Sequence, residues 1–397
     1  MRKNHSINDL ETPALLIDVS RVEKNIQRYQ AIANHEGVKL RPHGKTSKLE
    51  PIWDMQREAG AKGLTVATVR EAEVAMVSGH RDIFIAYPHV DPKALARIHD
   101  LTKVAHITLL VANKEGADIV HDFFKANKPC PNILLAIDTG LHREGVPAKH
   151  PKTIEFIKYL AERFGDRFRG ITTHEGHSYK TRQPQTVVSI AKTVRNTMIE
   201  LKKKCEKAGI TLHEVAIGAT PTFAYFKNDG KHTITEAHPG NYVFFDATQV
   251  DLGVAKPEEC ALTVLAQVID RHAVTRVRDG EREKVGMVYV NAGSKILSEA
   301  KRPHGEGGLS YGKVFSDLSA TTINPDASLR SLSEEIGWME VPPEEIPEIG
   351  EKIRLLAQHA CPTIACNPRA WLIDGEKIIG PAVIRARGYE RFKRAQK

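Results

Sequence analysis

The sequence predicts an α/β protein made of a closed (β/α)8 barrel of the TIM type followed by an antiparallel β domain. Over about the first 250 residues, short apolar and β-rich runs recur without strict alternation, as in parallel strands buried on both faces. The segments between these runs are long enough for crossover helices. After Asp246 the runs lie nearer to one another with turn-like glycine pieces between them, as in antiparallel sheets. A doubly wound open sheet is the alternative to the barrel.

Eight runs are expected to form the barrel strands. They are residues 38–41, 63–68, 82–87, 106–111, 132–138, 168–174, 214–220 and 242–246. The earlier run Leu15–Asp18 precedes the first barrel strand, and we expect it to join the C-terminal β domain. We place the domains at residues 15–250 for the barrel and at 251–397, together with 1–14, for the β domain.

Five runs are expected to form strands of the β domain. They are residues 261–268, 285–290, 353–356, 363–364 and 382–385. A turn is expected at Asp279-Gly280, because an Asp-Gly pair readily adopts the backbone conformation of a hairpin turn.

The composition is that of an ordinary soluble globular protein, with 41% apolar and 27% charged residues. No apolar run approaches the length needed to span a bilayer, and none follows the basic N-terminal residues as in a signal peptide. We therefore expect a cytoplasmic protein that does not bind membranes. Its five cysteines are odd in number and widely scattered, so a disulfide framework is not expected.

The net charge of +8 raises the question of a nucleic-acid partner. The lysines and arginines are spread along the chain rather than gathered in one block, so we expect no nucleic-acid binding. Attraction of an anionic small molecule, such as a phosphate-bearing cofactor or a carboxylate substrate, explains the excess as well.

The segment Val38–Lys48 places Lys45 at the exit of the first barrel strand. Pro42 ends the strand and Gly44 frees the backbone just before the lysine. An amine held there can act as a nucleophile towards an aldehyde, which is Schiff-base chemistry. A solvated basic loop is the alternative for this segment taken alone.

Other polar groups gather at the ends of later strands, where the active groups of such barrels lie. Arg143 follows the fifth strand, and His174 ends the sixth. Gly218–Thr222 follows the seventh, and Pro239–Tyr242 precedes the expected eighth. The backbone amides and hydroxyls of the last two segments suit a phosphate dianion. Each group alone is a weak signal, and their joint placement is informative.

Several segments together resemble fold-type III pyridoxal-phosphate enzymes of the D-serine dehydratase and D-threonine aldolase group, which are relatives of alanine racemase. The matching segments are ETPALLID at 11–18, RPHGKTSK at 41–48, the D-x-G-x-x-R-x-G frame at 138–145, GATPT at 218–222, PGNYVFFD at 239–246, NAGSK at 291–295, SEE at 333–335 and HACPT at 359–363. The resemblance runs nearly end to end.

The resemblance implies a role for each matching residue. Lys45 is expected to carry pyridoxal 5'-phosphate as a Schiff base, and Arg143 to approach the cofactor's phenolic oxygen. His174 stands at the ring side of the cofactor. The residues expected to hold the cofactor's phosphate are Gly218, Thr220, Gly240, Asn241 and Tyr242. The resemblance also implies a homodimer.

His359 and Cys361 match the pair that binds a divalent metal in the dehydratase branch. On an extended segment, residues two apart project to the same side, so imidazole and thiolate could share one ion. Taken alone, the pair is more typical of a structural role. This donor set favours zinc, with manganese or magnesium as the alternatives. The aldolase branch typically has an aspartate in place of the cysteine.

The chain departs from the family pattern at four positions. Histidine is frequent where Ser47 and Ile336 stand, tyrosine where His174 stands, and aspartate where Asn291 stands. These departures affect which substrate is expected and which residue contacts the ring side of the cofactor.

We expect a lyase that dehydrates a D-3-hydroxy amino acid to a 2-oxo acid and ammonia. An aldolase that gives glycine and an aldehyde is the nearest alternative. Racemisation would require a second base opposite Lys45, for which the sequence offers no clear candidate. A non-catalytic pyridoxal-phosphate protein would resemble the barrel alone, and the second domain argues against it.

Overall fold

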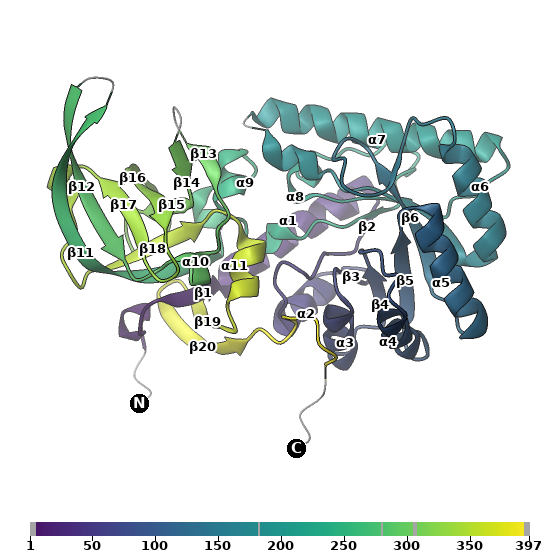
Figure 1. Ribbon diagram of the computed structural model, residues 1–397, viewed down its shortest axis with the longest axis horizontal. Helices are drawn as coiled ribbons and strands as arrows, with labels where there is room; N and C mark the ends of the chain where they lie inside the picture. Colours follow the sequence, from purple (N-terminus) through teal and green to yellow (C-terminus); the bar gives the residue numbers. More distant parts are fainter. Residues whose placement is uncertain (1–4, 182, 279–280, 305–307, 393–397) are drawn as a thin grey trace, which may run out of the picture. The chain divides into compact units, whose positions relative to one another are not determined.

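The computed structural model describes residues 5–181, 183–278, 281–304 and 308–392. The chain divides into two compact units (Figure 1). One comprises Met1–Asn25 and Val243–Arg385, and the other comprises Ile26–Tyr242 and Ala386–Lys397. These bounds differ from the expected boundaries at residues 15 and 250.

The barrel unit contains eight parallel strands. They are β2 (Lys39–Leu40), β3 (Leu64–Val66), β4 (Asp82–Ile85), β5 (His106–Val111), β6 (Asn132–Asp138), β8 (Phe168–Thr172), β9 (Glu214–Ile217) and β10 (Glu236–Ala237). They pair in the order β3-β4-β5-β6-β8-β9-β10-β2. A parallel bridge between His43 and Thr65 joins the end of β2 to β3 and closes the ring. The predicted (β/α)8 barrel is therefore confirmed.

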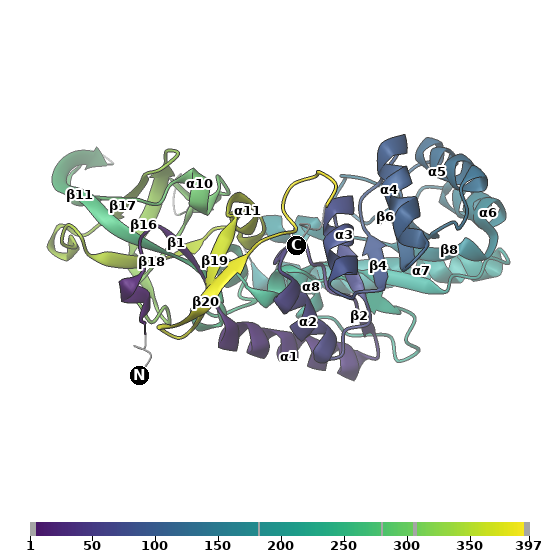
Figure 2. The ribbon, with the colours of Figure 1, turned by 90° about the horizontal axis from the view of Figure 1, so that it is seen from below.

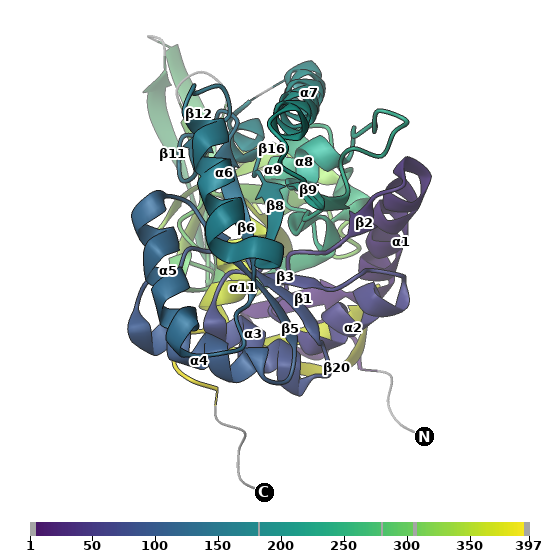
Figure 3. The same cartoon turned by 90° about the vertical axis from the view of Figure 1, so that its right-hand side faces the viewer.

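Helices surround these strands (Figure 3). They are α1 (Val19–Glu36), α2 (Glu50–Glu58), α3 (Val69–Val77), α4 (Pro92–Thr102), α5 (Lys114–Ala126), α6 (Thr153–Phe164), α7 (Pro184–Lys207) and the short α8 (Thr220–Phe223). Thr68, Asp91 and Asn113 cap α3, α4 and α5 by accepting a hydrogen bond from a first-turn amide. A short strand β7 (Val146–Pro147) pairs with the end of β6.

The expected eighth strand at 242–246 is wrong. Residues Asn241–Val243 form a 3-10 turn, and the eighth strand is β10 instead. This strand is short and polar, and its Glu236 is buried beside Arg41, whose Nε lies 2.8 Å from the carboxylate oxygen. The strand therefore lacks the apolar signal of its neighbours. Consequently, the segment Pro239–Tyr242 follows the eighth strand rather than preceding it.

The second unit is built on a nine-stranded sheet. Its strands are β1 (Ala14–Asp18), β11 (Leu262–Arg278), β12 (Glu281–Val290), β15 (Gly312–Phe315), β16 (Ile323–Leu332), β17 (Gly337–Val341), β18 (Lys352–Ala357), β19 (Arg369–Asp374) and β20 (Lys377–Val383). Their order is β12-β17-β16-β15-β18-β11-β1-β19-β20, with β11 also paired to β12. β13 (Arg302–His304) and β14 (Gly308–Ser310) form a separate ribbon. The pairings are antiparallel except that of β1 with β19, so the predicted antiparallel domain is confirmed over the described residues.

β1 lies between β11 and β19 in this sheet, beside the C-terminal strands (Figure 2). Its Leu16 packs in a buried cluster with Ile7, Leu265 and Ile373. The expectation that Leu15–Asp18 joins the C-terminal domain is therefore confirmed. This pairing also explains why the first residues of the chain belong to the second unit.

One expected strand of the β domain is wrong. Residues 363–364 lie inside helix α11 (Ala360–Cys366), because a two-residue apolar run cannot distinguish a strand from a buried helix. The other helices of this unit are α9 (Ala247–Asp251) and α10 (Ser294–Leu297). The expected turn at Asp279-Gly280 lies outside the described residues. Among the helices described, none combines the length and the apolar character needed to cross a membrane.

Candidate active site

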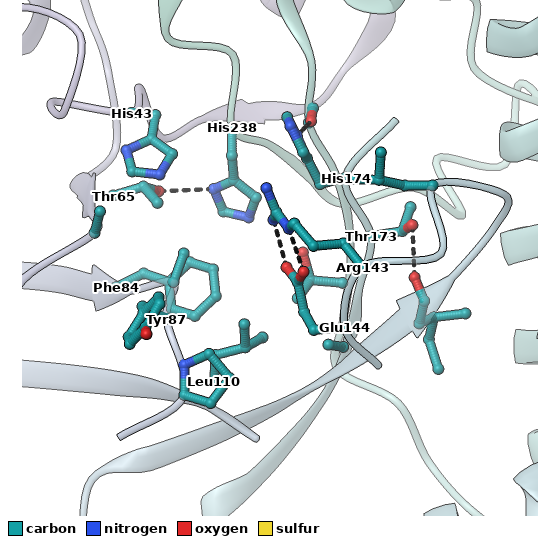
Figure 4. Close-up of a pocket in the computed structure, with 18 of the residues that line it drawn as sticks. His43, Thr65, Phe84, Tyr87, Leu110, Arg143, Glu144, Thr173, His174 and His238 are labelled. Carbon is teal, nitrogen blue, oxygen red and sulfur yellow. Dashed lines mark hydrogen bonds and ion pairs between the residues drawn. The ribbon is translucent and has the colours of Figure 1, made fainter. Parts of the chain in front are cut away.

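A cavity of about 470 Å³ lies at the carboxyl ends of the barrel strands (Figure 4). Its polar lining comes from residues just past the strand ends, among them His43, Lys45, Asp138, Arg143, His174 and His238. Phe84, Leu110 and Ala136 line it from a buried apolar cluster. The volume and the mixed lining are those of a small-molecule or cofactor site. The predicted placement of polar groups at this end of the barrel is confirmed for Lys45, Arg143, His174 and Gly218, all of which line the cavity.

Among the described residues that line this cavity, Lys45 is the one lysine. Its loop is fixed just before the lysine, where the Gly44 amide donates to the Thr65 carbonyl at 2.7 Å. The indole Nε1 of Trp53 donates to the Gly44 carbonyl at 3.2 Å. A Cβ at position 44 would lie 2.7 Å from the Trp53 ring, so only glycine permits this approach. The nearby Lys48 is instead engaged in an ion pair with the buried Glu71.

Three buried imidazoles share the cavity with Lys45. Burial lowers the pKa of His174 and of His238 to about 3, and the Lys45 charge also lowers that of His174. Burial, with the charge of Lys45, lowers the pKa of His43 well below its ordinary value. All three rings are therefore neutral near pH 7. Because the Gly218 carbonyl only accepts, its contact with His174 Nδ1 places the proton on Nδ1 and leaves the Nε2 lone pair available.

Arg143 and Glu144 lie side by side in the cavity and form a two-pronged ion pair (Figure 4). The loop that presents them is held by Asp138, whose Oδ1 accepts from the amides of Gly140 at 2.9 Å and His142 at 3.1 Å. The guanidinium is thus available at the cavity, although a carboxylate already neutralises its charge. Nothing in the sequence pattern had singled out Glu144.

The segments expected to cradle phosphate lie next to each other, but some of their groups are already bonded. The Gly218 amide donates to Glu175 at 3.1 Å, and the Tyr242 amide donates to Thr220 Oγ1 at 3.1 Å. Within the part of the chain that is described, the amides of Ala219, Thr220 and Gly240 have no acceptor.

These three amides fit a phosphate group. Ala219 and Thr220 are buried, and a buried amide without an acceptor is costly unless a ligand oxygen satisfies it. A Cβ at Gly240 would lie 2.9 Å from both the His43 carbonyl and Thr46 Oγ1, so the backbone can pass here only as glycine. Phosphate oxygens are the natural acceptors for amides grouped in this way.

Glu175 is a buried carboxyl group that the sequence analysis missed. It accepts from the Gly218 amide at 3.1 Å and from Thr222 Oγ1 at 3.4 Å, and so holds both ends of the loop that contains Ala219 and Thr220. Burial raises its pKa to about 7. The available signal was its place directly after His174, at the end of a barrel strand.

The predicted metal pair belongs to the second unit, but it does not lie on an extended segment. His359 is the N-cap of α11, and Cys361 lies in the first turn of that helix. The geometric premise of the prediction is therefore wrong, although the two side chains do interact. Burial alone would lower the pKa of His359, but the charge of Cys361 and a hydrogen bond to Asp246 outweigh it and raise that pKa well above its ordinary value.

The donor set of this pair fits a thiophilic divalent metal such as zinc. Over the described residues, no group of three or more His, Cys, Asp or Glu side chains is arranged to hold a metal ion. Among the described residues, the ligands would therefore be this pair, and two ligands leave positions open for substrate and water.

Asp246 contacts both the His359 ring and the backbone between His359 and Cys361. Its Oδ2 lies 2.8 Å from His359 Nδ1 and accepts from the Ala360 amide at 2.9 Å, while its Oδ1 accepts from the Gln249 amide at 3.0 Å. The sequence analysis treated this residue only as the end of a strand. The signal that could have found it is an aspartate in the N-cap position before α9.

Asn291, one of the departures from the family pattern, has a structural role here. Its Nδ2 donates to Thr12 Oγ1 at 2.9 Å, and its Oδ1 accepts from the Gln267 amide at 2.8 Å. The amide side chain donates in one contact and accepts in the other, whereas a carboxylate here would require the Thr12 hydroxyl to act as the donor.

Two family models match the chain in succession. The alanine racemase N-terminal domain matches residues 17–248, and the serine dehydratase domain matches residues 261–373. The chain is 32% identical over 380 residues to D-threo-3-hydroxyaspartate dehydratase from Delftia sp. (strain HT23), covering 92% of this chain and 95% of the relative. It is 27% identical over 388 residues to D-serine dehydratase from Dictyostelium discoideum, covering 91% and 93%.

A solved structure of the Delftia dehydratase aligns with a TM-score of 0.84 and 30% identity, covering 97% of this chain and 100% of that one. A variant of D-threo-3-hydroxyaspartate dehydratase with a cysteine replaced by alanine has been solved in a metal-free form. The first family model covers more than half of the chain, and these relatives align over nearly all of it. The chain therefore belongs to the alanine racemase N-terminal domain family and carries the serine dehydratase domain after that barrel.

Proposed function

We propose that the protein is a pyridoxal-phosphate-dependent lyase that dehydrates a D-3-hydroxy amino acid to a 2-oxo acid and ammonia. The observation that carries the proposal is Lys45, which is the one lysine lining the barrel cavity in the described part of the chain. The same part of the barrel holds buried amides for which no described acceptor exists. The names of the relatives in Delftia and Dictyostelium, both dehydratases of D-amino acids, support the reaction class.

Each group around the cavity has a part in holding the cofactor. Lys45 Nζ would bind its aldehyde, and the amides of Ala219, Thr220 and Gly240 would bind its phosphate, with the Thr220 hydroxyl beside them. Gly218, Asn241 and Tyr242 shape that loop. When bound, the cofactor supplies an electron sink for the electrons released at the substrate's Cα.

The remaining steps belong to the protein's own side chains. Lys45 Nζ, when it is not bound to the cofactor, would accept the proton from the substrate's Cα. The neutral rings of His174 and His238 add no positive charge that would disfavour protonation of Lys45. Arg143 offers its guanidinium to the cofactor's phenolic oxygen, and would exchange its contact with Glu144 to do so.

A divalent metal on His359 and Cys361 would act as a Lewis acid at the substrate's 3-hydroxyl. The thiolate favours zinc over manganese or magnesium, because softer ligands select softer ions. This pair favours dehydration over the aldolase reaction, because a Lewis acid held there would assist the departure of a hydroxyl group. Cleavage of Cα–Cβ would instead require a base to remove the hydroxyl proton.

Product analysis with D-serine, D-threonine and the stereoisomers of 3-hydroxyaspartate tests the proposal. D-Threonine, if accepted, should give 2-oxobutyrate and ammonia. Glycine and acetaldehyde as the main products would establish the aldolase alternative and leave the cofactor proposal intact. The proposal includes a homodimer, on the family resemblance alone, which light scattering in solution would test.

A further inference from the structure

We propose that Asp246 is a positioning residue that orients His359 for metal binding. This inference rests on the proposed metal site, and it extends that site from two residues to three. It concerns residues of one unit only.

A single oxygen of Asp246 contacts both the ring of His359 and the backbone that leads to Cys361. Oδ2 lies 2.8 Å from His359 Nδ1 and 2.9 Å from the amide nitrogen of Ala360, the residue between His359 and Cys361. The ring of one candidate ligand and the backbone that carries the other are therefore fixed by the same atom. A shift of this carboxylate would move both.

The contact decides which nitrogen of His359 is available. An ionised carboxylate only accepts, so it holds a proton on Nδ1 of the imidazole. The proton that the ring releases when it binds a metal is therefore the one on Nε2, whose lone pair then becomes the donor. A carboxylate behind a metal-binding histidine fixes the tautomer and makes the ring a better donor. That is the arrangement a metal at Nε2 requires.

Asp246 is itself held rigidly. It is 2% exposed or less, and its second oxygen accepts from the Gln249 amide at 3.0 Å, which caps helix α9. These contacts and its burial fix the position of the carboxylate. Its place behind His359 also agrees with the absence, among described residues, of a three-residue ligand cluster.

The alternative is that Asp246 only caps α9. A capping role needs one oxygen and is common at exposed positions. Here the other oxygen contacts the His359 ring and the Ala360 amide. The two roles can be separated, because asparagine and serine also cap helices but lack the negative charge.

The test is the zinc affinity of the purified protein, measured by competition with a chromophoric chelator. Asp246→Asn should bind zinc about 10–100-fold more weakly than the unaltered protein. Its thermal midpoint should fall, because asparagine keeps one acceptor for the cap but buries an NH2 group that faces donors, so zinc affinity is compared at a temperature where both proteins are folded. Asp91→Asn is the matched control, because Asp91 caps α4 in the barrel unit and should leave zinc affinity unchanged.

Asp246→Ser provides a second variant in case the buried amide disturbs folding, and it should show the same loss. Cobalt in place of zinc should retain its thiolate charge-transfer band in Asp246→Asn, although more cobalt is needed to reach it. Unaltered zinc affinity in both variants, with zinc lost in Cys361→Ala, would overturn the role of Asp246 alone. Unaltered zinc binding in His359→Ala and Cys361→Ala would overturn both this inference and the metal site.

Discussion

The ionisation of the buried Glu175 should make the stability of the folded protein depend on pH. Burial raises the pKa of this carboxyl from 4.5 to about 7. Between these values the folded protein binds a proton at Glu175 that the unfolded chain has released, so stability falls as the pH rises through this range. By the linkage relation, the raised pKa of Glu175 lowers the free energy of unfolding by about 1 kcal/mol at about pH 5 and by about 3 kcal/mol at about pH 8.

Glu175→Gln removes this titration while it keeps an oxygen that can accept from Gly218 and Thr222. Its new NH2 group is buried and costs about 1–3 kcal/mol at any pH. The free energy of unfolding of the variant minus that of the unaltered protein should therefore rise by about 2.5 kcal/mol from about pH 5 to about pH 8. The difference between the two pH values is diagnostic, because the constant cost cancels.

Urea unfolding followed by circular dichroism at the two pH values measures this difference. Glu162→Gln is the control, because Glu162 is exposed and its replacement should leave the pH dependence unchanged. If Glu175→Gln keeps the pH dependence of the unaltered protein, the carboxyl is not held neutral and the reasoning fails.

Three further predictions concern the Lys48–Glu71 ion pair, the proposed phosphate site and the proposed metal site. Lys48→Ala should lower the free energy of unfolding by about 3–5 kcal/mol, because it leaves Glu71 buried without its cation, and calorimetry would measure this. Thr220→Asp should weaken cofactor affinity by at least about tenfold through repulsion of the phosphate, as followed by absorbance titration; an unchanged affinity would place the phosphate elsewhere. Chelation should abolish activity and zinc should restore it, whereas full activity in Cys361→Ala would remove the metal from the mechanism.

The barrel could be predicted because most of its strands are buried on both faces and read as apolar runs. Ile133, Leu134 and Leu135 of β6 are fully buried and give this signal clearly. The eighth strand could not be found, because its buried Glu236 is satisfied by Arg41, which follows the neighbouring strand β2. That pairing joins residues 195 apart in sequence, which no local pattern reveals.

The candidate site was predictable where chemistry follows a strand end, as with Lys45 and Arg143. The supporting groups were not predictable, because Glu175 and Asp246 act through contacts across 43 and 113 residues. The family resemblance pointed to His359 and Cys361, although the extended segment assumed for them is a helix N-terminus. Local patterns and the resemblance thus gave the candidate reactive groups, and missed the groups that hold them.

The most direct test of the account is to locate the lysine that binds pyridoxal phosphate. The protein with cofactor should be yellow, and reduction with borohydride followed by peptide mapping should place the label on the peptide that contains Lys45. Lys45→Ala should lose both the label and the activity. A label on Lys48, which is paired with Glu71, or on Lys295, which is paired with Glu335, would contradict the account.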